Sequence, residues 1–134
     1  MYDIIIIGSG PAGLTAAVYA RRAEKTVLIL EKSSFGGQIT YSPKVENFPG
    51  EIEISGNALA EKLIDQALNL DAEIELAQVT KIEKKDRFFI VSCDTSVYES
   101  KSVIIASGSK HRKLNLPLEN EFIGNGISYC AVCD

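Results

Sequence analysis

The chain has 134 residues, of which 46% are apolar and 24% charged, as is ordinary for a globular domain with a buried core. Its formal net charge is −4 and its basic residues form no stripe, which argues against nucleic acid as a partner. No apolar run approaches the roughly 20 residues of a membrane-spanning helix, and no secretion signal is evident. We therefore expect a cytoplasmic protein with no membrane partner.

The first thirty residues predict a strand, a helix and a second strand. Residues 2–8 form an apolar run that ends in glycine, which is typical of a strand buried on both faces of a parallel sheet. Residues 11–23 have helical spacing, and Pro11 suits a first helical turn. Residues 26–30 predict another buried strand, which ends at Glu31. The pattern indicates a βαβ unit.

A long loop and a second helix follow. Residues 33–56 are rich in glycine and proline and predict a loop, and loops of this length inside a compact domain tend to be functional. Residues 58–70 have the periodicity of an amphipathic helix, and residues 72–76 predict a short strand.

The remaining pattern is mainly β. Residues 78–100 predict a small antiparallel meander, with turns near residues 85–86 and 94–95. Residues 102–108 predict another buried strand that ends in glycine, and residues 109–134 have little periodicity and indicate a connector. The expected fold class is α/β, with a parallel sheet flanked by helices and the small antiparallel meander.

A glycine motif lies between the first strand and the first helix. Residues 8–13 read G-x-G-x-x-G, and Glu31 ends the next strand, which is the context that makes this motif specific for dinucleotides. Gly8 permits a tight turn, Gly10 allows a pyrophosphate to approach, and Gly13 allows close packing. Glu31 can accept hydrogen bonds from ribose hydroxyls and would repel a 2′-phosphate. The alternative is a purely structural turn, and the spacing does not decide between NAD and FAD.

Two cysteines lie at the end of the sequence. Cys130 and Cys133 have C-x-x-C spacing, which favours a dithiol that cycles through a disulfide. A zinc site needs four ligands, and only the distant Cys93 and His111 could join this pair, so we expect no metal within one chain. Metal shared between two chains stays an alternative.

Taken together, these motifs resemble one family. The segments IIIIGSGPAGLTAAVYA, GGQIT, VENFPG, VIIASGS and CAVCD, in this order, resemble the N-terminal portion of bacterial-type, low-molecular-weight thioredoxin reductases. The resemblance extends over essentially the whole chain. It implies a Rossmann-like FAD-binding domain in a homodimeric enzyme, in which NADPH reduces FAD, FAD reduces the cysteine pair and the dithiol reduces thioredoxin.

The resemblance also implies roles for individual residues. Cys133 would lie nearest the flavin, Cys130 would attack thioredoxin, and Asp134 would serve the dithiol as an acid–base group. Gln38 and Asn47 would contact FAD towards its flavin end, and Val79 would face the adenine. The full set of expected cofactor-binding residues is Gly8, Ser9, Gly10, Pro11, Ala12, Gly13, Glu31, Gly36, Gly37, Gln38, Asn47, Val79, Ser107 and Gly108.

The sequence departs from the family pattern in its extent. The family continues into an NADPH domain and returns to the FAD domain with a further strand and helix, so we expect a fold that is incomplete at its C-terminus and inactive alone. Residues 1–110 would be the FAD-binding portion, and residues 111–134 a connector and the start of the NADPH and dithiol domain. An open sheet edge favours a homo-oligomer. Two alternatives stay open, a nucleotide-binding module without redox turnover and a thiol or metal-binding protein.

Overall fold

A computed structural model describes residues 1–130 of the chain and has the predicted α/β fold. Within these residues, six strands, two long helices and two short helical segments succeed one another. In chain order they are β1 (Tyr2–Ile7), α1 (Pro11–Arg22), β2 (Val27–Glu31), the 3-10 helix η1 (Gly37–Tyr41), α2 (Gly56–Leu68), β3 (Glu73–Leu76), β4 (Val79–Lys85), β5 (Phe88–Cys93), β6 (Val97–Ile105) and α3 (Glu119–Phe122).

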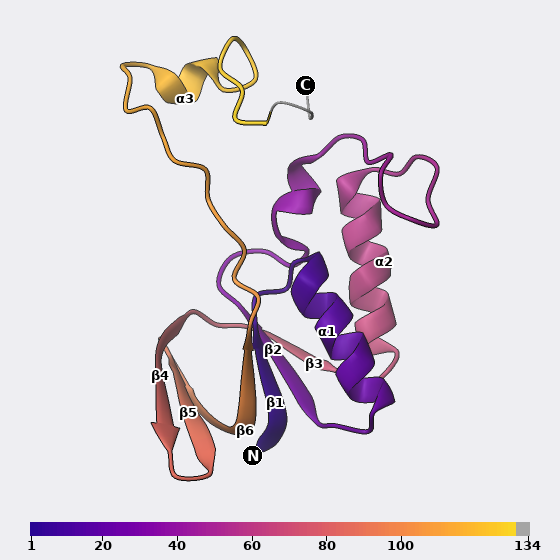
Figure 1. The fold of residues 1–134 in the computed structure, drawn as a ribbon, viewed down its shortest axis with the longest axis vertical. Coiled ribbons are helices and arrows are strands. Elements are labelled where there is room, and N and C mark those ends of the chain that lie inside the picture. Colours follow the sequence, from indigo (N-terminus) through magenta and orange to yellow (C-terminus); the bar gives the residue numbers. More distant parts are fainter. Residues whose placement is uncertain (131–134) are drawn as a thin grey trace.

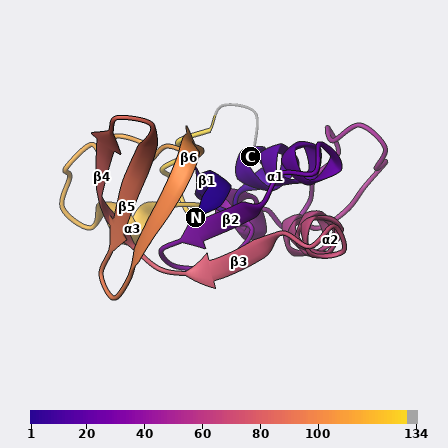
Figure 2. The same cartoon turned by 90° about the horizontal axis from the view of Figure 1, so that it is seen from below.

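All six strands form one sheet in the order β3-β2-β1-β6-β5-β4. The first four strands of this order are parallel, and β5 and β4 continue the sheet as an antiparallel ribbon. Figure 1 shows α1 and α2 side by side next to the parallel strands. Figure 2 shows the antiparallel ribbon turning away from the plane of the parallel strands. The predicted βαβ unit and the predicted meander are both confirmed.

Each face of the parallel sheet is buried against a different layer. Successive side chains of a strand point to opposite faces, so Ile5 and Ile6 belong to different clusters although both are fully buried. Ile6 packs with Leu14 of α1 and with apolar residues of α2. Ile5 packs with Val91 of the antiparallel ribbon. The ribbon therefore covers the face that the helices leave open.

Strand β6 differs from its prediction in two ways. We expected the last meander strand and the following buried strand to be separate, but both are parts of the continuous β6. Its first half pairs with β5 as far as Ser100, and its second half pairs with β1 from Ser100 onward. The prediction of burial was wrong, because Ile104 and Ile105 are 37% and 70% exposed. Ribbon strand β5 turns away before it reaches them.

The segment predicted as one loop, residues 33–56, is more ordered than expected. It contains η1 and an isolated antiparallel bridge between Val45 and Ile54. Ser55 then starts α2, because its side chain accepts a hydrogen bond from the backbone N–H of Ala58 and so satisfies one of the free donors of the first turn. The segment is thus folded back against α2.

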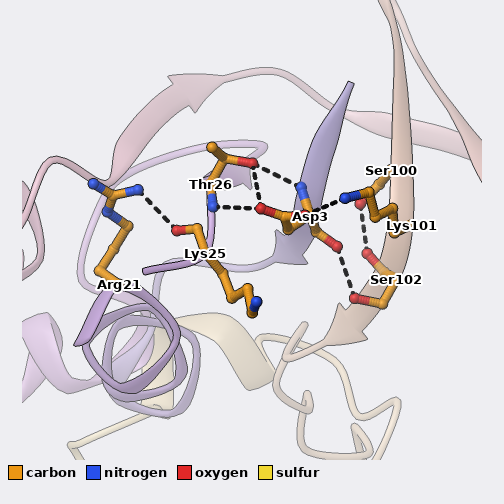
Figure 3. Close-up of polar contacts among 7 residues, drawn as sticks. All are labelled: Asp3, Arg21, Lys25, Thr26, Ser100, Lys101 and Ser102. Atoms are coloured by element: carbon orange, nitrogen blue, oxygen red, sulfur yellow. Dashed lines mark hydrogen bonds and ion pairs between the residues drawn. The ribbon is translucent and has the colours of Figure 1, made fainter. Parts of the chain in front are cut away.

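A polar cluster lies at the end of the sheet where β1 begins (Figure 3). The Asp3 carboxylate accepts hydrogen bonds from the N–H and hydroxyl of Thr26 at 2.9 and 3.0 Å and pairs with Lys101 at 2.7 Å. The hydroxyl of Ser102 donates to the carbonyl of Asp3. The Lys101 ammonium, followed by the Thr26 N–H, holds the pKa of Asp3 well below its ordinary value. This cluster joins β1, β6 and the turn before β2.

The helices within residues 1–130 are all too short or too polar to cross a membrane.

Candidate functional site

The predicted cofactor-binding residues gather at the end of the sheet opposite the Asp3 cluster. Strands β1, β2 and β6 are parallel neighbours, so their carboxyl ends lie along one edge. From β1 the chain continues to β2 on one side and reaches β6 on the other. Ligands of open α/β sheets bind where the strand order reverses in this way.

Gly8, the first glycine of the motif, lies where two chain segments approach closely. Its φ is +104°, and a Cβ atom at this position would lie 2.3 Å from the carbonyl oxygen of Ala106, directly after β6. The backbone N–H of Ala106 also donates to the carbonyl of Ile7 at 2.8 Å. Only glycine fits at position 8. The close approach of Ala106 to Gly8 also places Ser107 and Gly108, which follow Ala106, beside the glycine loop.

The glycine loop and the GGQ loop form a backbone cradle at the start of α1. Gly10 is the N-cap of α1, no side chain caps this helix, and Pro11 follows at its first position. A Cβ atom on Gly37 would lie 2.9 Å from the Cα atom of Gly10, so the two backbones approach without side chains between them. Uncapped N–H groups at a helix N-terminus favour phosphate. These residues therefore fit the pyrophosphate of a dinucleotide such as FAD.

Ser9 joins these two loops to the end of β2. It is fully buried, and its N–H and hydroxyl donate to Glu31 Oε2 at 3.0 and 3.1 Å. Its carbonyl accepts a hydrogen bond from the N–H of Gly36 at 3.0 Å. The loop between Gly8 and Gly10 and the loop before η1 are therefore held in one arrangement by Glu31.

The Glu31 carboxylate is saturated by donors from the protein. Besides Ser9, the N–H groups of Lys32 and Ser33 donate to Oε1 at 2.9 and 3.1 Å, and the Ser33 hydroxyl lies 3.4 Å away. Burial raises the pKa of Glu31, but the hydrogen bonds, led by the Ser9 N–H, outweigh it and hold this pKa below its ordinary value. A ribose hydroxyl would have to replace one donor, and the long Ser33 contact is the weakest.

The other predicted cofactor residues lie on the surrounding segments. Gln38 is exposed on η1, and its amide donates to the carbonyl of Ser109 at the start of the connector. Val79 is the first residue of β4 and packs against the ribbon-side cluster, the apolar cluster that contains Ile5 and Val91. Asn47 is exposed in the loop between η1 and α2. Pro11, Ala12 and Gly13 form the first turn of α1, where Gly13 is buried.

The dithiol residues are only partly within the described chain. Cys133 and Asp134 lie outside the described residues. Cys130 is half-buried, and its backbone is held by Ser128, whose hydroxyl accepts from the Cys130 N–H at 3.1 Å and donates to its carbonyl at 3.0 Å. In residues 1–130 no three side chains of the metal-binding types gather in one place. Cys93 packs against the ribbon-side cluster, and burial raises the pKa of its thiol.

One feature next to Cys130 was not predicted. The imidazole of His111 stacks on the ring of Tyr129, with ring centroids 3.9 Å apart and an angle of 17° between the planes. From the sequence we expected His111 to be solvated and assigned it no role beyond that of a poor zinc-ligand candidate, because 17 residues lie between it and Tyr129 and no periodic pattern links them. Only the fold of the connector brings the rings together.

Comparison with known proteins gives consistent results. The family model described as pyridine nucleotide-disulphide oxidoreductase matches residues 2–134. The thioredoxin reductase of Treponema pallidum is 46% identical over 99% of this chain, and that of Ureaplasma parvum is 45% identical over all of it. The crystal structure of thioredoxin reductase from Streptococcus pyogenes covers the whole chain with a TM-score of 0.90 and 45% identity.

The match is one-sided in length. The chain spans 44% and 43% of the two curated relatives and 44% of the S. pyogenes chain. The likeness therefore concerns less than half of each relative.

Proposed function

The chain belongs to the pyridine nucleotide-disulphide oxidoreductase family, and on this premise we propose that it is the FAD-binding portion of a thioredoxin reductase. The observation that carries the proposal is the side-chain-free approach of Gly10 and Gly37 at the uncapped start of α1. This cradle lies at the carboxyl ends of the parallel strands, where a dinucleotide is expected.

The residues of the cradle would have distinct roles towards FAD. The N–H groups of Ala12 and Gly13 in the first turn of α1 would face the pyrophosphate, with the helix dipole favouring its charge, whereas Pro11 has no N–H to donate. Glu31 would orient the glycine loop through Ser9 and meet the ribose in place of Ser33. Gln38 and Asn47 would lie towards the flavin and Val79 towards the adenine. A bound flavin supplies two-electron transfer between a nicotinamide and a disulfide.

The cysteine pair would pass the electrons on. The Cys130–Cys133 disulfide takes up two electrons and two protons to give two thiols, and the Cys130 thiolate then attacks the disulfide of a thioredoxin-like partner. Cys133 would resolve the mixed disulfide, and Asp134 would exchange the proton. The reductant would be NADPH, which needs a dinucleotide-binding site of its own. The sequence has no second glycine motif like that of residues 8–13 to form such a site. We therefore expect no NADPH-dependent turnover by the 134-residue chain alone.

The decisive experiment uses Gly10→Ala. Gly10 has φ −71° and ψ 177°, and an added Cβ atom would lie 4.0 Å from the Cα atom of Gly37, an ordinary van der Waals distance, so the fold should be unchanged. The methyl group would nevertheless occupy the approach of the pyrophosphate. We expect FAD affinity, measured by equilibrium dialysis, to fall about tenfold or more, since a misplaced methylene costs about 1–3 kcal/mol. Thr15→Ala, on the exposed side of α1, is the matched control.

The two alternative functions predict different ligands in the purified wild-type chain. A wild-type chain that binds ADP but not FAD would be a nucleotide-binding module, and one that contains zinc would be a thiol or metal-binding protein. Equal FAD affinity for wild type and Gly10→Ala would contradict the placement of the pyrophosphate.

A homo-oligomer is a further part of the proposal. Among the described residues no strand pairs with residues 101–105 of β6 on the side away from β1, and Ile105 is 70% exposed there. An unpaired edge with apolar side chains favours pairing with another chain. Light scattering of the purified chain should give at least a dimer, and a monomer at micromolar concentration would contradict this part alone.

A further inference from the structure

We propose that His111 and Tyr129 form a clasp that positions Cys130 for thiol–disulfide exchange. The two rings are nearly parallel, with an angle of 17°, and their centroids are 3.9 Å apart. This inference rests on the proposed function, because it takes Cys130 and Cys133 to be a redox dithiol. It assigns a role to His111, which the proposed function does not use.

The clasp acts on Cys130 through the backbone. Tyr129 directly precedes Cys130, so a ring held against His111 restricts the dihedral angles that determine where Cys130 lies. Ser128 restricts the same residue from the other side of Tyr129, since its hydroxyl bonds both the N–H and the carbonyl of Cys130. The clasp and the Ser128 hydroxyl together define the position of the first sulfur.

The contact between the rings depends on packing and not on the phenol hydroxyl. The Tyr129 hydroxyl oxygen is buried and has no hydrogen-bond partner within the described part of the chain. Removing this hydroxyl should therefore leave the stack in place, whereas removing the ring should abolish it. Tyr129→Phe and Tyr129→Leu thus separate the ring from its polar group.

The clasp also closes the connector into a loop. Glu119 holds the early part of the connector by accepting hydrogen bonds from the N–H groups of Leu114 and Leu116, and the N–H of Ile127 donates to the carbonyl of Phe122 in the later part. The stack joins the start of the connector to its end. The stack therefore holds Tyr129, the residue before Cys130, against His111, two residues after Ser109, whose carbonyl accepts from Gln38 of the GGQ loop.

A positioned Cys130 should favour the disulfide over the dithiol. Residues that are already ordered lose less conformational entropy when the small ring between the sulfurs closes. Aromatic pairs contribute enough to shift an equilibrium constant by about two- to tenfold. Loss of the clasp should therefore make the disulfide easier to reduce by a factor in this range.

The first measurement tests the clasp itself by proton NMR on the full chain. His111 is the only histidine, so its ring protons are unique signals. In the wild type these protons should be shifted upfield by the ring current of Tyr129. The shift should persist in Tyr129→Phe and disappear in Tyr129→Leu. Unshifted His111 protons in a folded wild-type chain would overturn the proposal.

The second measurement tests the effect on the cysteines. The chain is equilibrated with glutathione and glutathione disulfide, which takes two electrons and two protons from the dithiol to become two glutathione molecules. Mass spectrometry then gives the oxidised fraction. We expect His111→Ala and Tyr129→Leu to lower the equilibrium constant for oxidation about two- to tenfold. His111→Phe, which keeps an aromatic partner, and Tyr129→Phe should stay within about twofold of the wild type.

The outcomes separate this inference from the proposed function. If the wild type forms no Cys130–Cys133 disulfide at any glutathione ratio, both fall. If it forms the disulfide but His111→Ala behaves as the wild type does, only the clasp is refuted. Circular dichroism of each variant distinguishes loss of the clasp from loss of the fold, and a change confined to unfolded variants would count against positioning.

Discussion

The body of the molecule, residues 1–106, and the connector segment, residues 111–130, are stabilised by different interactions. In the body, apolar side chains on both faces of the sheet are almost completely buried. In the connector, five large apolar side chains are 41–60% exposed, and its one buried side chain is the charged Glu119. The exposed side chains are Leu114, Leu116, Leu118, Phe122 and Ile123. The body thus depends on burial, and the connector on a few hydrogen bonds and one ring stack.

The largest expected effect compares one leucine from each region. Leu14 is fully buried between α1 and the sheet, so Leu14→Ala should lower the free energy of unfolding by about 2–5 kcal/mol. Leu116 is 55% exposed, so Leu116→Ala should change it by less than about 0.5 kcal/mol. Urea titration followed by circular dichroism measures both. Similar losses for the two variants would show that the connector shares the core of the body.

A second prediction concerns Glu31, the carboxylate that holds the glycine loop. Glu31→Gln places an amide N–H₂ among backbone donors and should cost about 1–3 kcal/mol at neutral pH. Because the folded-state pKa of Glu31 is lowered, its stabilisation is complete above the unfolded pKa of about 4.3 and is lost as pH falls through the folded value.

The measurement for Glu31 is a series of urea titrations from pH 7 downward. The difference between wild type and Glu31→Gln should shrink as acid protonates the wild-type carboxyl. Glu61→Gln, an exposed change on α2, is the control and should show no such trend. A difference that is constant down to pH 2 would contradict the assigned role of the charge.

The smallest expected effect concerns Glu119, which does for the connector what Glu31 does for the glycine loop. Burial raises the pKa of Glu119, but hydrogen bonds from the Leu114 and Leu116 N–H groups outweigh it and lower this pKa. Glu119→Gln should therefore speed hydrogen exchange at these two amides at neutral pH without moving the urea midpoint of the body. Unchanged exchange at both amides, or a shifted global midpoint, would remove the distinction between the two regions.

The sequence predicted the parts of the fold that depend on neighbours along the chain. The βαβ unit, the amphipathic helix and the turns of the meander follow from local periodicity and from glycine and proline, and the structure confirms them. The context of residues 8–13 likewise predicted the turn between β1 and α1. In these segments the local preference and the tertiary environment agree.

The features that were missed depend on contacts between distant segments. The apolar run that ends β6 resembles the run of β1, but its exposure depends on where β5 turns away, which no residue of β6 encodes. The saturation of Glu31 by Ser9 and Ser33 required the two loops to be placed side by side. The approach of His111 to Tyr129 likewise required the whole connector.

The length of strand β6 also sets the distance between the antiparallel ribbon and the proposed cofactor cradle. It is held in register by β5 up to Ser100 and by β1 beyond it, and one residue after its end the Ala106 carbonyl lies against Gly8. Deleting one residue between Val97 and Ser100 would force one of these two registers to slip, and a slip of one position turns every side chain to the opposite face. Changes in the length of β6 would therefore move one wall of the proposed nucleotide site.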